Sequence, residues 1–288
     1  MGTTRSPDEW VASESGTMAI VEVRLNMSRC SIPLWAVAGL SIGCAKVDEA
    51  PKEYESAVAY VFAHFEDEDP TELVDTIDFL DEWLVGADLD AAQEGLAIQN
   101  LSNSAVADLE GHAHQTSGLE GVSLATESRY PTCTLMEALT QYSFARMMPD
   151  VYITYDREFD EGQDCIANRD CLWAEGSVYS VADWGLLGEV TAERQIQYRW
   201  VQTAAGWAFL QRWWLTDVST GTRLGLTIDD QYYVGINFPA GNGTRRVHAS
   251  WLTMEMATGD ASSGASKQLI KNWKKDASDL DGWIAENL

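Results

Sequence analysis

The chain has 288 residues, with 45 acidic and 19 basic side chains, which gives a formal net charge of −26. Contacts to a nucleic-acid backbone need clusters of Lys and Arg, so this charge argues against a nucleic-acid partner and against electrostatic docking on anionic lipid headgroups. Hydrophobic residues make up 45% of the chain, which is enough apolar surface to bury one sizeable core or two small ones.

The first distinct element is the segment 27–44, MSRCSIPLWAVAGLSIGC, which has the parts of an export signal. Arg29 gives it a positive start, an apolar run follows over 32–42, and the small residue Gly43 directly precedes Cys44. The run is too short for a membrane-spanning helix, which needs roughly 20 apolar residues. An ordinary secretion signal and a buried core element are the alternatives.

The ending LSIGC resembles the lipobox of bacterial lipoproteins, in which the cysteine is diacylated and becomes the new N-terminus. The sequence departs from that family at Ser41, because an aliphatic residue is usual three places before the cysteine. The resemblance implies an exported protein that is lipid-anchored through Cys44 in the bacterial cell envelope, in the periplasm or at the outer membrane. Two acyl chains would hold it firmly, since each buried methylene contributes about 0.8 kcal/mol.

The acidic residues within 1–26 conflict with the basic start that a signal prefers. We therefore expect translation to begin at Met27 and 1–26 to be an extension that is not translated. The segment 27–43 is then the signal peptide, 44–52 a lipid-anchored tether, and 53–288 a single globular domain.

Three cysteines remain in the mature chain when Cys44 is lipidated. Cys165 and Cys171 flank a polar loop between two apolar segments, and we predict that they form a disulfide that contributes roughly 2 kcal/mol. Pairing of Cys133 with either of them is the alternative. The sequence has no CxxC or Cys/His spacing of a zinc site, and we expect neither a metal nor a cofactor.

The part 53–146 of the domain is predicted to be mainly helical. Apolar side chains recur at helical spacing over 54–65. The next helix has a clear start, with Asp69 as its N-cap and Pro70 in its first turn, and it is expected to end near Gly86.

The next segments give weaker signals. A short helix is expected over 90–98, and the Ser-, Asn- and Gly-rich stretch 101–121 is expected to be a surface loop. A strand is predicted over 122–129. Thr134 and Glu137 have the spacing of a capping box, which predicts the start of another helix.

From Val151 onward the apolar residues recur with a period of two, which is typical of strands. Tight turns are expected at Gly206 and at the Gly241-Asn242-Gly243 sequence. The predicted strands are 195–201, 207–216, 226–238 and 245–256, and an amphipathic helix is predicted over 267–288.

This order predicts an α+β fold with N-terminal helices, an antiparallel β-meander and an amphipathic C-terminal helix that packs on the sheet. The layout of 150–288 resembles START-like helix-grip domains, in which a curved sheet wraps around the last helix. The resemblance covers only the order of the elements, and it implies an apolar cavity between the sheet and that helix.

Motifs for catalysis or metal binding are missing or incomplete. The sequence has no GxSxG, HExxH or SxxK motif, so an enzyme is the weaker interpretation. The acidic run 156–164 lacks the glycine and the bidentate acid of an EF-hand and is expected to be a solvated loop. His112 and His114 would share a metal only if both rings lay on one face, and their surroundings favour a surface loop.

Aromatic residues are the remaining signal, because most tryptophans lie in the C-terminal half. Core packing accounts for most of them. The residues that we expect to line a ligand cavity are Tyr198, Trp200, Trp213 and Tyr232.

The sequence thus predicts a lipid-anchored envelope protein that binds an apolar small molecule, with the membrane as its other partner. One alternative is a structural or interaction lipoprotein whose helical region 52–100 docks an unknown protein. Another is a carbohydrate-binding protein with exposed tryptophans and an acid pair such as Asp229 and Asp230, for which the sequence gives no spacing.

Overall fold

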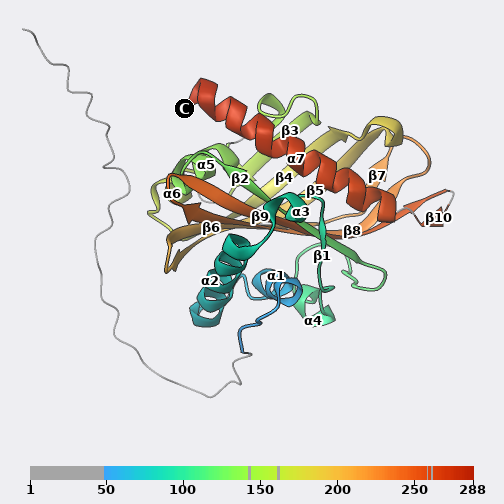
Figure 1. The fold of residues 1–288 in the computed structure, drawn as a ribbon. Helices are drawn as coiled ribbons and strands as arrows, with labels where there is room; N and C mark the ends of the chain where they lie inside the picture. The colour runs from blue at the N-terminus through green and yellow to red at the C-terminus, as the bar shows by residue number, and fades with distance from the viewer. Residues whose placement is uncertain (1–48, 142–143, 161–162, 258, 261) are drawn as a thin grey trace, which may run out of the picture. The chain divides into compact units, whose positions relative to one another are not determined.

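The computed structural model describes residues 49–141, 144–160, 163–257, 259–260 and 262–288 (Figure 1). The signal-like segment and Cys44 lie outside the described residues, so the lipid anchor stays a prediction. In the described part of the chain, no helix is long and apolar enough to cross a membrane.

A single antiparallel sheet dominates the described residues. Its neighbours follow the order β1-β2-β9-β8-β6-β5-β4-β3, while β7 pairs with β5 and β8, and β10 pairs with β9. The strands are β1 (Leu96–Ala97), β2 (Glu120–Ser128), β3 (Tyr152–Phe159), β4 (Trp173–Asp183), β5 (Glu189–Thr203), β6 (Gly206–Leu215), β7 (Ser219–Gly221), β8 (Thr227–Ala240), β9 (Gly243–Met256) and β10 (Gly259–Asp260).

Short connections explain most of this order. The strands β3 to β6 pair one after another as a meander, and β8 and β9 form a long hairpin. The hairpin closes through Gly241 and Asn242, with Ala240 opposite Gly243. Gly241 has a φ of +60°, so Gly241 is the glycine that the turn requires, and the two turn residues are the Gly-Asn pair.

Helices cover both faces of the sheet (Figure 1). The helices α1 and α2 lie on one face, and α7 runs across the other. The predicted α+β class, with a C-terminal helix on an antiparallel sheet, is confirmed. The helices are α1 (Tyr54–Ala63), α2 (Thr71–Gly86), α3 (Leu89–Ala92), α4 (Asn103–Val106), α5 (Thr132–Leu139), α6 (Gln163–Asn168) and α7 (Ser262–Asn287), with short 3-10 turns η1 (Phe144–Arg146) and η2 (Gly185–Leu187).

Strand alternation divides the core between the two faces. Tyr232, Val234 and Ile236 of β8 pack against the apolar side of α1, whereas Tyr233 belongs to the clusters under α7. Successive side chains of a strand point to opposite faces, so each long central strand contributes to both cores. The sheet is therefore the middle layer of a three-layer domain.

Two arginines of the sheet hold the C-terminal end of α1. Arg212 donates to the carbonyl oxygen of Phe62 at 2.9 Å, and Arg199 donates to those of Phe65 at 2.5 Å and Asp67 at 2.8 Å. The last carbonyls of a helix have no donor within the helix and carry its partial negative charge. Arg212 is only 3% exposed, so it satisfies the Phe62 carbonyl inside the core.

The prediction of a helix over 90–98 is wrong in its second half. The helix α3 ends at Ala92, and the chain then forms the short strand β1. Gly95 separates the two with a φ of +101°, and a Cβ there would lie 2.4 Å from the Ile270 side chain of α7. This close approach requires glycine and ends the helix.

The capping box at Thr134 and Glu137 is also wrong. The helix α5 begins at Thr132 after Pro131, so Thr134 lies inside its first turn. The start of α2 is close to the prediction: Asp69 accepts hydrogen bonds from the backbone N–H and the hydroxyl of Thr71, at 3.0 and 2.6 Å.

The surface loops predicted at 101–121 and 156–164 contain regular structure. The first includes α4 and the start of β2. In the second, Asp156 and Glu158 are exposed residues of β3 that alternate with buried Arg157, so the acidic pattern belongs to the outer positions of a strand. The end of that run enters α6, and a disulfide joins Cys165 to Cys171 across a Cα–Cα distance of 5.4 Å.

Candidate functional site

A cavity of about 100 Å³ lies between the sheet and α7. The strands β3, β4, β5, β6, β8 and β9 supply its floor, and Trp273 and Asp276 of α7 close it from above. Its lining residues are Leu139, Phe144, Met148, Tyr152, Tyr155, Val178, Arg194, Ile196, Gln211, Trp213, Tyr233, Arg246, His248, Trp273 and Asp276.

Stacked rings form much of the cavity wall. Trp213 stacks on Tyr233 with 5.2 Å between the ring centroids, and His248 stacks on Trp273 at 5.8 Å. Gly235 leaves room for the Tyr233 ring on the sheet, since a Cβ at this position would lie 2.7 Å from the tyrosine hydroxyl oxygen. The wall is thus fixed by packing from three strands and one helix.

Three buried polar atoms in this wall have no hydrogen-bond partner among the described residues. Arg194 donates from Nη1 to the Ser180 hydroxyl at 2.6 Å, but its Nε has no acceptor. Arg246 donates from Nε to Asn237 Oδ1 at 3.0 Å, but its Nη1 has no acceptor. The Oδ1 atom of Asp276 also lacks a partner. Buried groups of this kind are normally satisfied, so these three need an explanation.

Burial shifts the charge of these groups toward neutrality. It lowers the pKa values of both Arg194 and Arg246, although each guanidinium stays charged near neutral pH. Burial raises the pKa of Asp276 to about 7, against the opposing attraction of Arg246. Burial and the neighbouring Arg246 hold the pKa of His248 well below its usual value. The cavity is therefore positively charged inside a strongly acidic protein.

The imidazole of His248 is neutral under these conditions and is oriented by its neighbours. Its Nδ1 lies 2.9 Å from the Tyr233 hydroxyl, and its Nε2 lies 3.3 Å from the Thr126 hydroxyl. Both contacts are compatible with a single ring proton, since each hydroxyl either donates or accepts. His248 is thus a fixed polar element of the wall.

The four residues predicted to line a cavity lie at different places. Trp213 lines it. Tyr198 and Trp200 lie on the same side of β5 but further along, in a solid cluster with Phe209 and the end of α7. Tyr232 lies on the opposite face of the sheet, against α1. A ligand role for the four stays a prediction, and only Trp213 is placed to contact this cavity.

Sequence reasoning missed the charged residues of the cavity. Arg246 and His248 alternate with buried Val247 in β9, and Arg194 begins the run of alternating residues in β5. Polar residues at alternate positions usually face solvent, but here α7 covers that face. One sequence signal could have predicted that these residues are buried. The last helix has an apolar stripe, which indicates that this helix covers the face of the sheet on which the polar residues of these strands lie.

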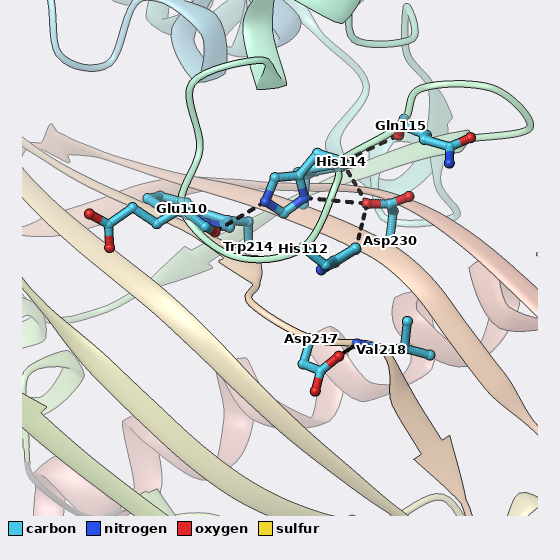
Figure 2. Close-up of polar contacts among 9 residues, drawn as sticks. Glu110, His112, His114, Gln115, Trp214, Asp217, Val218 and Asp230 are labelled. Carbon is cyan, nitrogen blue, oxygen red and sulfur yellow. Dashed lines mark hydrogen bonds and ion pairs between the residues drawn. The ribbon is translucent and has the colours of Figure 1, made fainter.

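A second cluster lies on the face of α1, away from the cavity. His112 and His114 meet Asp230 at the start of β8 (Figure 2), so the residues weighed separately in the sequence come together in space. Burial alone would raise the pKa of Asp230, but its contacts with His114, Tyr232 and His112 lower it. The carboxylate is therefore ionised at neutral pH.

Comparison with known proteins gives only distant similarity. No protein-family model and no curated protein matches the chain. Among solved structures, the Zhui aromatase/cyclase from Streptomyces sp. R1128 is 13% identical with a TM-score of 0.39, over 58% of this chain and 94% of that one. A STAR-related lipid transfer protein fragment from Xanthomonas axonopodis is 12% identical with a TM-score of 0.37, over 60% and 97%.

A third structure, TTHA0849 from Thermus thermophilus, is 16% identical with a TM-score of 0.40, over 58% of this chain and 97% of that one. Identities and TM-scores this low do not transfer a function. The function of this chain is therefore inferred from its own residues.

Proposed function

We propose that this domain binds a small, mostly apolar carboxylic acid in the cavity between the sheet and α7. The observation that carries the proposal is the pair of buried guanidinium groups, Arg194 and Arg246, each with an unpartnered nitrogen in an aromatic wall. A carboxylate only accepts hydrogen bonds, and Arg is the side chain whose planar fork suits it best.

The volume limits the ligand to a small molecule. Pockets for drug-sized ligands occupy roughly 300–1,000 Å³, and an engineered cavity of roughly 150 Å³ accommodates benzene. A space of about 100 Å³ is smaller than that cavity, so it suits a short aliphatic chain with an acid group and is too small for an aromatic acid or a whole lipid. The aromatic pair Trp213 and Tyr233 would contact the apolar part.

The charge balance favours an anion over a neutral ligand. An isolated buried charge is costly unless it is paired and hydrogen-bonded. Asp276 offsets the positive charge only in part, because its pKa of about 7 leaves it partly protonated at neutral pH. A bound carboxylate would accept from the free nitrogens of both arginines, while protonated Asp276 would donate to it.

Calorimetry with two probes of one shape tests this proposal. We expect butyrate to bind with one-to-one stoichiometry and butyramide to bind at least about tenfold more weakly, which corresponds to about 1.4 kcal/mol. The variant Arg246→Met should remove this preference, and Arg194→Met provides a second test. Arg245→Met is the matched control, because Arg245 pairs with Asp81 on the other face of the sheet. Equal affinities for the two probes, or no binding of either, would refute the proposal.

The proposed setting is the bacterial cell envelope, with the domain anchored through lipidated Cys44. The lipobox-like segment supports this setting. Labelling of expressing cells with radioactive palmitate tests it: the wild-type chain should incorporate label, and the variant Cys44→Ala should not.

The alternative functions have less support. In the described part of 52–100, the apolar side chains of α1 and α2 pack against the sheet, and Val85 is the exposed large hydrophobic residue. None of the described tryptophans is exposed, so no flat aromatic surface for stacking sugars is present among them. Neither a partner-docking helix face nor a carbohydrate platform is favoured.

A further inference from the structure

The second cluster is built by a loop that crosses the face of the sheet opposite to α7. The loop 107–119 follows α4 and lies over β6 and β8 (Figure 2). The backbone N–H of His112 donates to the carbonyl oxygen of Thr216 at 3.1 Å, which fixes the loop to the end of β6. This attachment places the rings of His112 and His114 beside Asp230, with 4.6 Å between their centroids.

Three groups converge on one oxygen atom. His112 Nε2 lies 3.2 Å, His114 Nδ1 lies 3.3 Å and the Tyr232 hydroxyl lies 2.8 Å from the same Oδ1 of Asp230. A carboxylate oxygen has two lone pairs, so three donors exceed what it accepts well. Hydrogen bonding alone accounts for the tyrosine contact and leaves the two imidazoles crowded at long distances.

The other ring nitrogen of His114 already has a partner. His114 Nε2 lies 3.1 Å from the carbonyl oxygen of Glu110, and the Trp214 indole also donates to that oxygen at 2.9 Å. A carbonyl oxygen only accepts, so Nε2 carries the ring proton and Nδ1 of the neutral ring presents a lone pair toward Asp230. Histidines that bind metals have this arrangement, with the second ring N–H donated to a carbonyl or carboxylate.

The two separations from Asp230 Oδ1, 3.2 Å to His112 Nε2 and 3.3 Å to His114 Nδ1, match the edge of a tetrahedral metal site better than the length of charge-assisted hydrogen bonds. With metal–ligand bonds of roughly 2.0–2.1 Å, the edge of a tetrahedron is about 3.3 Å. Hydrogen bonds from a charged donor to a carboxylate are usually about 2.7–2.9 Å. The ligand atoms of His112, His114 and Asp230 all lie within 4.8 Å of one another.

We propose that His112 Nε2, His114 Nδ1 and Asp230 Oδ1 form a binding site for Zn²⁺. Two imidazoles and one carboxylate are ligands that this ion takes, and three protein ligands leave its fourth position open to water or another molecule. The side chain of His112 is 21% exposed, which gives the ion a route from solvent. Tyr232 then holds the ligating carboxylate from the protein side.

This site is independent of the carboxylic-acid cavity, because it lies on the other face of the sheet. Its test uses the full chain after treatment with a chelator and extensive dialysis. We expect equilibrium dialysis to show one Zn²⁺ per chain, bound at micromolar concentration or below. Co²⁺ in its place should give the intense visible absorption of a tetrahedral site.

Substitution of the ligands provides the decisive comparison. Asp230→Asn and His112→Gln should each lower the zinc affinity at least about tenfold, while Asp229→Asn and His64→Gln should leave it unchanged. His64 is a useful control because it contacts Asp67 at 2.8 Å in an ordinary histidine–carboxylate pair. If Asp230→Asn does not fold, His112→Gln alone decides, since it changes a partly exposed side chain.

Two results would overturn the assignment. The first is a wild-type chain that binds less than one equivalent of zinc at 0.1 mM free metal, a level chosen as roughly a hundredfold above a micromolar dissociation constant. The second is a set of ligand variants that bind zinc as tightly as the two controls. In either case the cluster would serve only to tie the loop to β8.

Discussion

Replacement of Asp276 by asparagine tests the electrostatics of the cavity most directly. Burial raises the pKa of this carboxyl from 3.8 to about 7 in the folded protein, while Arg246 opposes the shift. One pKa unit corresponds to about 1.4 kcal/mol, so a shift of about three units corresponds to at most about 4 kcal/mol. The variant keeps the shape of the side chain and removes its titration.

The sign of the effect follows from proton linkage. The folded state holds the proton of Asp276 more tightly than the unfolded state does, because its folded pKa is the higher one. The contribution of this group to stability is therefore fully present below about pH 4 and is lost as the pH rises through about 7. Asp276→Asn should match the wild type near pH 4 and be more stable near pH 8, by about 1–4 kcal/mol.

Urea unfolding at pH 4, 6 and 8 measures this difference. The charged and titratable groups near Asp276 are Arg246 on β9, Tyr233 on β8, Tyr152 on β3, and Lys275 and Asp279 on α7. Glu286→Gln is the matched control on the same helix, because Glu286 is exposed and does not interact with Asp276. A stability difference between Asp276→Asn and wild type that is the same at all three pH values would refute the reasoning.

Further substitutions test the packing, each by the midpoint of denaturant unfolding unless another assay is named. Arg212→Met should cost about 3 kcal/mol, because it leaves buried acceptors at the end of α1 without a donor, and an unchanged midpoint would contradict this role. Leu280→Ala should cost about 3 kcal/mol, since this residue of α7 is fully buried against the sheet; a cost below about 1 kcal/mol would show that α7 packs loosely. Cys165→Ser should cost about 2 kcal/mol under oxidising conditions and nothing in excess reductant, whereas equal costs would argue against the disulfide. Gly235→Ala should displace the Tyr233 ring and weaken butyrate binding at least about tenfold, and unchanged affinity would place the ligand elsewhere.

The sequence correctly predicted the elements in which apolar residues recur with one clear period, either that of a helix or that of a strand. The apolar stripe over 267–288 identified α7, and the alternation of Ile196, Tyr198 and Trp200 identified β5. The same alternation wrongly predicted that the polar residues between them face solvent, because Gln197 is also buried. Helices cover both faces of the sheet, so a polar residue between two apolar ones faces a second core instead of solvent.

The two candidate sites were beyond prediction for a different reason. Asp230 lies 118 residues from His112 in the chain, and it meets the histidine only because the loop 107–119 is tied to β6. Likewise, Arg194 and Asp276 share a cavity through the register of the strands and the path of α7. Such proximity depends on tertiary pairing, which local spacing does not encode.

The buried arginines on the two faces of the sheet differ in how fully their nitrogens are hydrogen-bonded. On the α1 face, the nitrogens of Arg212 are occupied by the carbonyl oxygen of Phe62 and the side chains of Gln197 and Glu66. Arg157, which keeps one free nitrogen, packs against aromatic rings and does not line the cavity. Arg194 and Arg246 differ from both, because each keeps a free nitrogen and each residue lines the cavity, with the Arg194 guanidinium packed on the Trp213 ring. Arg212 shows that this chain can satisfy a buried guanidinium fully, so an anionic ligand is the partner that we propose for Arg194 and Arg246, the two incompletely satisfied arginines that line the cavity.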